Sequence, residues 1–115
     1  MELFNSSKGC AVSGRMVVAD TFFSRLAGLM FRKGLAPDEC LMIRPCSMVH
    51  TFGMRFAIDV LFLSKEGEVL HIQKSMKPNR ISPWIRRAAS VIELAAGTAS
   101  KAGIDTGDRL LAVGR

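Results

Sequence analysis

The stretch Phe56-Ala57-Ile58-Asp59-Val60-Leu61-Phe62-Leu63 is the most hydrophobic run of the chain, and Asp59 is its only charged residue. Eight residues is the length of a strand rather than of a helix, and isoleucine, valine and phenylalanine are typical of strands. The run therefore predicts a central strand. The turn Lys65-Glu66-Gly67-Glu68 follows it and predicts a hairpin into a second strand over 69–72.

Working outward from this hairpin, the sequence predicts further strands over 9–18, 41–43, 91–94 and 109–113, with a bend at 13–14. Asp20 or Thr21 offers an N-cap for a helix over 20–32, whose apolar residues recur at the spacing of one helix face. Thr98 predicts the start of a short second helix that ends at Gly103. Together these elements predict an α+β domain, rich in β structure, with five or six strands and two helices.

The chain has 115 residues and a formal net charge of +6, from 16 Lys+Arg against 10 Asp+Glu. That length predicts a single domain over residues 1–115. The N-terminus lacks the pattern of a secretory signal, and no apolar stretch reaches the about 18–20 residues that cross a bilayer. Three cysteines are an odd number, which argues against a disulfide framework. We therefore expect a reduced, cytoplasmic protein.

Positive charge is concentrated in one segment. No acidic residue occurs between Val69 and Ile92, and the only tryptophan, Trp84, lies among basic residues there: Lys74, Lys77, Arg80, Arg86 and Arg87. Basic residues around an exposed aromatic ring suit RNA, single-stranded DNA or an anionic membrane surface. The favoured interpretation is a solvated loop whose apolar residues, Ile81, Trp84 and Ile85, pack onto the core. The absence of a recognised module argues against nucleic acid as the partner.

Several stretches, taken in order, resemble the domain-of-unknown-function family 192, also described as uncharacterised protein family 0127. They are Arg25–Arg32, Met54 followed by Ile58–Leu63, Val91–Gly97, and Gly107–Asp108. The resemblance covers most of the chain from residue 20 to residue 113. It implies a β-dominated fold in which a helix packs against a strongly curved or barrel-like sheet, and it implies no particular activity.

One segment departs from that family. Many relatives carry a cluster of an aromatic residue, tryptophan and methionine before the Ile-Asp strand, where this chain reads Pro45-Cys46-Ser47-Met48-Val49-His50-Thr51-Phe52-Gly53-Met54-Arg55. The resemblance therefore assigns no role to these residues. Residues 97–113 also resemble the end of a PDZ domain, but the glycine-rich loop that holds a peptide carboxylate in such domains is missing.

Cys46 and His50 are the sharpest candidate pair for chemistry. A thiolate and an imidazole can share Zn²⁺, with Cys40, His71 and Asp59 as candidates for the remaining ligands. Alternatively, Cys46 is a nucleophile that His50 activates and Asp59 orients. The favoured interpretation is structural, because a free cysteine often behaves as a small buried hydrophobe. The common nucleotide, flavin and hydrolase motifs are missing, so the sequence predicts no cofactor, with zinc as the alternative.

Two acidic residues lie inside apolar strands. Asp59 needs a partner when buried, and Arg25 or Arg55 is the expected one; the alternative is an acid at the mouth of a pocket. Glu93, in the strand over 91–94, likewise needs a partner if it is buried. The two carboxylates would form one small polar site with His50 and Arg55 if their strands are neighbours.

These observations favour a non-catalytic binding module that holds a small ligand or a partner segment in a cleft between helix 20–32 and the sheet. Its predicted ligand-binding residues are His50, Thr51, Arg55, Asp59 and Glu93. The first alternative is a metal-binding or hydrolytic enzyme that uses Cys46, His50 and Asp59. The second is weak binding of nucleic acid or an anionic surface through the loop over 74–87, with Lys77, Arg80, Trp84, Arg86 and Arg87 in contact.

Overall fold

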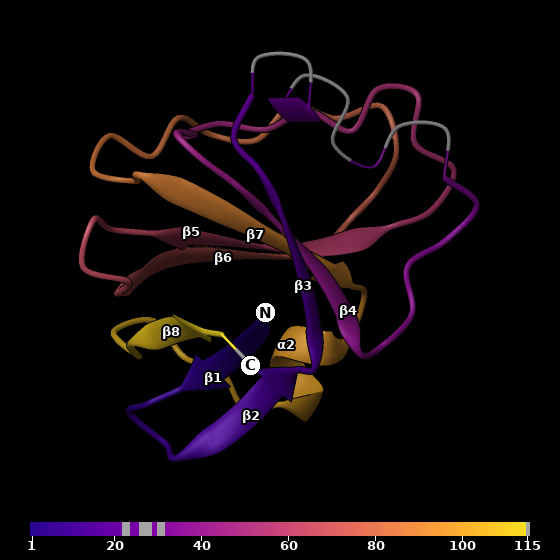
Figure 1. Cartoon of the computed structure of the whole chain (residues 1–115). Helices are drawn as coiled ribbons and strands as arrows, with labels where there is room; N and C mark the ends of the chain where they lie inside the picture. The colour runs from indigo at the N-terminus through magenta and orange to yellow at the C-terminus, as the bar shows by residue number, and fades with distance from the viewer. Residues whose placement is uncertain (22–23, 26–28, 30–31, 115) are drawn as a thin grey trace.

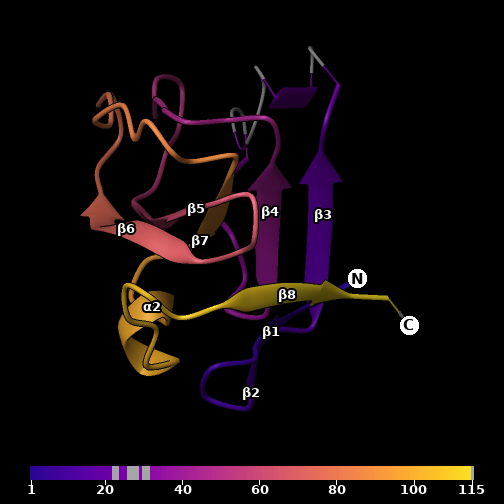
Figure 2. The ribbon, with the colours of Figure 1, turned by 90° about the vertical axis from the view of Figure 1, so that its left-hand side faces the viewer.

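The structure is a computed structural model that describes residues 1–21, 24–25, 29 and 32–114. A three-stranded sheet of order β2-β1-β8 consists of β1 (Glu2–Asn5), β2 (Cys10–Ser13) and β8 (Leu110–Val113). A five-stranded sheet of order β3-β4-β7-β5-β6 consists of β3 (Arg15–Ala19), β4 (Glu39–Ile43), β5 (Ile58–Leu63), β6 (Val69–Met76) and β7 (Ser90–Ala95). In Figures 1 and 2 the small sheet and α2 (Thr98–Lys101) lie below the large sheet, and long loops lie above it.

The predicted barrel-like sheet of five or six strands with two helices is wrong. Eight strands form two open sheets, and the described part of the chain holds one helix, α2, of four residues. The error arises because the sequence pattern joins β2 and β3 into one strand and gives no signal for β1, whose four residues include Glu2 and Asn5. Most of the predicted helix over 20–32 lies outside the described residues.

The central strands of the large sheet, β4, β7 and β5, are buried on both faces, which explains the continuous apolar run in β5. One core cluster lies between this sheet, the small sheet and α2, and it includes Leu3, Leu61 and Leu110. The second cluster covers the opposite face and includes Val60, Phe62 and Val49 from the loop after β4. The predicted central strand is confirmed, because all six residues of β5 are buried and β5 pairs with both β6 and β7.

The predicted bend at 13–14 is where the chain passes from the small sheet to the large one. The Asp38 carboxylate accepts a hydrogen bond from the Gly14 N–H at 2.8 Å, and the Ser13 hydroxyl donates to the Asp38 carbonyl at 2.7 Å. A Cβ at position 14 would lie 2.7 Å from the Asp38 carboxylate, so a larger residue there would displace this side chain from its hydrogen bond to the Gly14 N–H. From there β3 pairs with β4 in parallel, while the other pairs of the large sheet are antiparallel.

The helix signals are partly confirmed. The Thr21 hydroxyl accepts a hydrogen bond from the Ser24 N–H at 3.1 Å, and the Arg25 N–H donates to the Thr21 carbonyl at 2.9 Å, so Thr21 caps a helical turn as predicted. At the second helix the N-cap is Gly97, with φ of 91°, and not Thr98. No helix in the described ranges has the length and apolar content needed to span a membrane.

Replacing Gly67 with alanine is expected to cost about 3 kcal/mol of folding free energy. Gly67 has φ of +86°, and a Cβ there would lie 2.5 Å from the Leu110 carbonyl oxygen, so the substitution adds a backbone clash to the strain. The matched control is Gly107→Ala, because Gly107 has φ of +92° with open space around the added Cβ. Urea unfolding should give a smaller loss for the control, and equal losses would contradict the clash.

Candidate functional site

Glu93 is a carboxylic acid in the middle of the large sheet. It lies on β7 opposite Leu41 of β4 and Val60 of β5, and only 2% of its surface is exposed. No hydrogen bond to its carboxylate is present among the residues described. Burial raises the pKa of the Glu93 carboxyl to about 7. The group therefore changes between its neutral and charged forms near physiological pH, which is typical of functional acids.

Cys46 faces the same side of the sheet as Glu93. It packs against the core cluster on that side, and its thiol donates a hydrogen bond to the Met48 carbonyl at 3.1 Å. Burial raises the pKa of the Cys46 thiol; the charge of Glu93 raises it further, while Arg25 lowers it. Glu93 and Arg25 are thus each within electrostatic reach of Cys46. The neutral thiol is a poor nucleophile, because the thiolate is the reactive form.

His50 does not share a hydrogen bond with Cys46. Its Nδ1 atom accepts the Phe52 N–H at 3.2 Å, and the two rings stack with centroids 5.5 Å apart. His50 forms an isolated bridge with Ile81, so this part of the chain runs extended along the loop before β7. The two side chains therefore have different partners, the Met48 carbonyl for Cys46 and the Phe52 N–H for His50.

Thr51 and Arg55 are predicted ligand-binding residues that follow His50 in the same loop. Thr51 is fully buried; its hydroxyl donates to the Lys77 carbonyl at 2.6 Å and accepts the Arg80 N–H at 2.9 Å. Thr51 thereby joins this loop to the one that follows β6. Arg55 is exposed, and its guanidinium forms no ion pair with any described residue.

Asp59 is occupied by backbone groups rather than by arginine. Its carboxylate accepts the Ser75 N–H and the Ala99 N–H, each at 2.9 Å, and its exposed surface is 1%. Within the described ranges neither Arg25 nor Arg55 forms an ion pair with it. Asp59 thus joins β5 to the irregular part of β6 and to the first turn of α2.

The candidate residues lie on opposite faces of the large sheet. Cys40 belongs to the cluster between the sheets, and Cys46 packs on the other face. Asp59 reaches α2 on the first face, whereas Glu93 lies in a cross-strand row with Leu41 and Val60 of the second cluster. The strands of the two acids are neighbours, as the predicted polar site required, yet their side chains point apart.

A metal site finds no complete ligand set in the part of the chain that is described. No group of three or more His, Cys, Asp or Glu side chains there is placed to hold an ion. His71, another candidate ligand, packs its ring against Phe62, and its buried Nε2 has no hydrogen-bond partner in the same residues. The zinc site and the Cys46 nucleophile remain predictions.

A cavity of about 290 Å³ lies between strands β3 and β4 and four described residues that follow β3, namely Ser24, Leu29, Arg32 and Leu35. Leu29 and Leu35 line one side of it, and Val17 and Leu41 line it from the sheet. Arg32 and Glu39, which form an ion pair at 3.4 Å, also line it. Its wall is therefore mainly apolar, with two charged groups.

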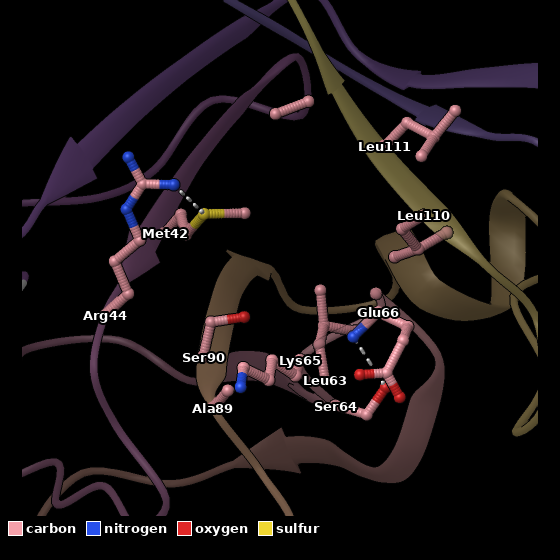
Figure 3. A pocket seen from close by; sticks show the side chains of 12 residues that line it. Met42, Arg44, Leu63, Ser64, Lys65, Glu66, Ala89, Ser90, Leu110 and Leu111 are labelled. Carbon is pink, nitrogen blue, oxygen red and sulfur yellow. Dashed lines mark hydrogen bonds between the residues drawn. The ribbon is translucent and has the colours of Figure 1, made fainter.

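A second cavity, of about 310 Å³, opens between the two sheets (Figure 3). Arg44 and Met42 lie on one side of it and Leu110 and Leu111 on the other, while Glu66 lies near Leu110. The Arg44 guanidinium approaches the Met42 sulfur at 4.0 Å. None of the residues that the sequence selects for a site lines this cavity.

All predicted contact residues of the basic segment are exposed: Lys77, Arg80, Trp84, Arg86 and Arg87. The interpretation that Ile81 and Trp84 pack onto the core is wrong, because they are 61% and 65% exposed. Ile85 does pack against the core, as expected.

The pattern that defines the DUF192 family, described as an uncharacterised ACR family, matches residues 4–112. This chain belongs to the DUF192 family. A UPF0127 protein of Pyrococcus furiosus is 34% identical over 114 residues, which cover 94% of this chain and 95% of that protein. A UPF0127 protein of Thermococcus sibiricus is 31% identical over 94% of this chain and 72% of its own length.

Solved structures show the same fold as this DUF192 chain. A protein of unknown function from Novosphingobium aromaticivorans superposes with a TM-score of 0.84 at 22% identity, covering 96% of this chain and 82% of that one. A putative transcription regulator from Sinorhizobium meliloti superposes with a TM-score of 0.78 at 28% identity, covering 96% and 89%. The family is uncharacterised in function, so the comparisons establish the fold and the family and assign no activity.

The sequence of this DUF192 chain marks Glu93 as a candidate, but it does not mark the residues that lie beside Glu93 in the fold. Leu41 and Val17 lie beside it in one row across the sheet, and Leu29 faces them across the cavity. The only sequence signal was an acid inside an apolar strand. The parallel pairing of β3 with β4, which places Val17 beside Leu41, has no local signal in the sequence.

Proposed function

We propose that this protein is a small binding module whose ligand occupies the cavity between Leu29, Leu35 and the large sheet, and presents an amine to Glu93. The observation that carries the proposal is a buried carboxylate with no hydrogen-bond partner in the described chain, one strand in from the cavity wall. A buried carboxyl group without a partner is costly, so a ligand that donates hydrogen bonds to it gains affinity.

The register of the strands connects Glu93 to the cavity. Val17 pairs with Leu41, and Leu41 pairs with Glu93, so the three side chains project from one face in a row. Side chains that are directly opposite in neighbouring strands have Cβ atoms about 5 Å apart. A ligand that lies on Leu41 is therefore one side chain away from the acid.

The size and lining of the cavity restrict the ligand. A volume of about 290 Å³ is at the lower end for ligand sites, which favours a small molecule. Leucine and valine side chains form much of the wall and favour an apolar body. The Cys46 thiol is a titratable group near Glu93, and burial alone accounts for the high pKa of Glu93. No cation of the described residues forms an ion pair with the acid, and this role is open to a ligand cation.

The test uses three probes of equal length, namely hexylamine, hexanol and hexanoate, added to ¹⁵N-labelled protein. We expect hexylamine to bind best and hexanoate worst, with amide shifts concentrated at Val17, Leu41 and Glu93. Affinity for hexylamine should rise about tenfold between about pH 6 and about pH 8, because the charged form of Glu93 increases across that range. Equal affinity for all three probes, or tighter binding of hexanoate, would contradict the proposal.

A matched pair of variants locates the binding. Val17 is an exposed strand residue that lines the cavity, and Val113 is an exposed strand residue that does not. Val17→Trp should obstruct the cavity and weaken hexylamine binding at least about tenfold, an effect of about 1.4 kcal/mol. Val113→Trp should bind like the wild type, and a similar loss in both variants would show that the probe binds elsewhere.

A further inference from the structure

The loop after β4 and the loop after β6 both lie at the top of the molecule in Figures 1 and 2. The Thr51 N–H donates to the Arg80 carbonyl and the Ser82 N–H donates to the Val49 carbonyl, each at 2.9 Å, so the loops run side by side. Val49 and Thr51 face the interior, whereas Met48 and Phe52, at alternate positions, are exposed.

The exposed side chains of these loops are unusually apolar. We call Met48, Phe52, Ile81 and Trp84 the apolar tip; each is at least 44% exposed. Ile81 is bridged to His50 between Met48 and Phe52, and the Trp84 indole N–H donates to the Ser47 hydroxyl at 3.1 Å. The four side chains are therefore neighbours on one surface, and large apolar groups gathered in this way mark an interaction site.

The two segments that carry the apolar tip have an excess of positive charge. No acidic residue occurs between Glu39 and Asp59 or between Glu68 and Glu93, and these two segments carry seven basic residues: Arg44, Arg55, Lys74, Lys77, Arg80, Arg86 and Arg87. None of the seven forms an ion pair with another residue of the described ranges. The surface thus offers unneutralised positive charge to a partner.

A cavity of about 430 Å³ lies beside the apolar tip. Lys77 and Arg80 line it together with Gln73 and Ser75, and Ile81 and Pro83 form its apolar side. The Arg80 guanidinium donates to the carbonyls of Pro78 and Asn79 at 3.3 and 3.4 Å, which leaves other N–H groups for an anion. Two cations with neighbouring polar groups suit a phosphate.

We propose that this end of the molecule docks on an anionic phospholipid surface. Lys77 and Arg80 hold a headgroup phosphate in the cavity, and the apolar tip enters the interface between headgroups and acyl chains. Tryptophan is favoured at that depth, because its ring is apolar and its N–H is polar. Ile81 and Met48 favour lipid over single-stranded nucleic acid as the partner. Protein surfaces that bind single strands present aromatic rings for base stacking rather than projecting aliphatic side chains.

Trp84, the only tryptophan, reports directly on this docking. Vesicles of phosphatidylcholine with about one third phosphatidylglycerol should shift its fluorescence to the blue and should sediment the protein at low salt. Pure phosphatidylcholine vesicles should bind at least about tenfold more weakly, and added salt should weaken the binding to anionic vesicles. Equal binding to both kinds of vesicle, or none to either, would overturn the proposal.

A matched pair of double variants separates local charge from net charge. Lys77→Glu with Arg80→Glu should lower the partition onto anionic vesicles by at least about tenfold. Lys101→Glu with Arg109→Glu alters net charge equally, at exposed residues of α2 and the turn before β8, and should have a much smaller effect. Trp84→Ala should weaken binding to anionic vesicles, measured by sedimentation. Equal losses in the two double variants would overturn the assigned surface.

Two further probes distinguish other anions from lipid. Inorganic phosphate should displace the protein from anionic vesicles only at high concentration, because phosphate makes no contact with the apolar tip. An oligothymidine strand that quenches Trp84 while anionic vesicles leave it unchanged would assign the surface to nucleic acid and overturn the proposal.

Discussion

Replacing Glu93 with glutamine is expected to stabilise the protein by about 3 kcal/mol at about pH 8 and to change its stability little at about pH 4. Burial raises the pKa of the carboxyl from its ordinary 4.5 to about 7, so the folded protein keeps a proton that the unfolded chain has released. The free energy of unfolding therefore falls as pH rises from about 4.5 to about 7, and then levels off. Glutamine has no such proton to lose.

Urea unfolding at about pH 5 and about pH 8 measures this difference for the wild type and the variant. The matched control is Glu66→Gln, because Glu66 is an exposed glutamate in the turn between β5 and β6. The control should keep the fall in stability that the wild type shows. The same fall in Glu93→Gln would mean that the Glu93 carboxylate is stabilised by a partner and is not the isolated group described above.

Replacing Asp59 with alanine is expected to cost about 4 kcal/mol of folding free energy, the second large effect. The substitution removes the acceptor of two backbone N–H groups, those of Ser75 and Ala99, and leaves both without a partner. Each buried donor left unpaired costs about 1–3 kcal/mol, and the lost packing adds to this. Asp59→Asn keeps one oxygen acceptor and should lose about half as much.

Chemical denaturation gives the total loss, and amide hydrogen exchange locates it. Exchange should accelerate most at Ala99 and Ser75, whose amides Asp59 accepts. Asp20→Ala, at an exposed aspartate before the first helical turn, is the control and should change the free energy of unfolding little. If Asp59→Ala keeps the stability of the wild type but no longer binds hexylamine, Asp59 belongs to a functional site instead.

The sequence predicts those strands whose burial leaves a continuous signal. β5 is apolar at five of its six positions and lies between β6 and β7, so composition alone places it inside a sheet. β1 has no such signal, because its burial alternates over only four residues. Its position depends on pairing with β8, more than one hundred residues away, which no local pattern encodes.

The sequence likewise predicts only part of the candidate site. Glu93 and Asp59 stand out from the sequence because each is a charge in an apolar strand, and the structure shows both to be buried. Which one has a partner depends on the face to which each points, and that depends on the register of β5 with β7. The spacing of Cys46 and His50 places two side chains on one face of a helix, but this segment is not helical.

The claim that Glu93, buried and without a hydrogen-bond partner among the described residues, receives a ligand amine is tested most directly by carboxyl ¹³C NMR of Glu93, titrated from about pH 4 to about pH 9 without and with hexylamine. The account predicts a midpoint near pH 7 in the free protein, and a midpoint at least about one pH unit lower with hexylamine bound, because the ammonium group favours the carboxylate. An ordinary midpoint in the free protein, or one that hexylamine leaves in place, would contradict it.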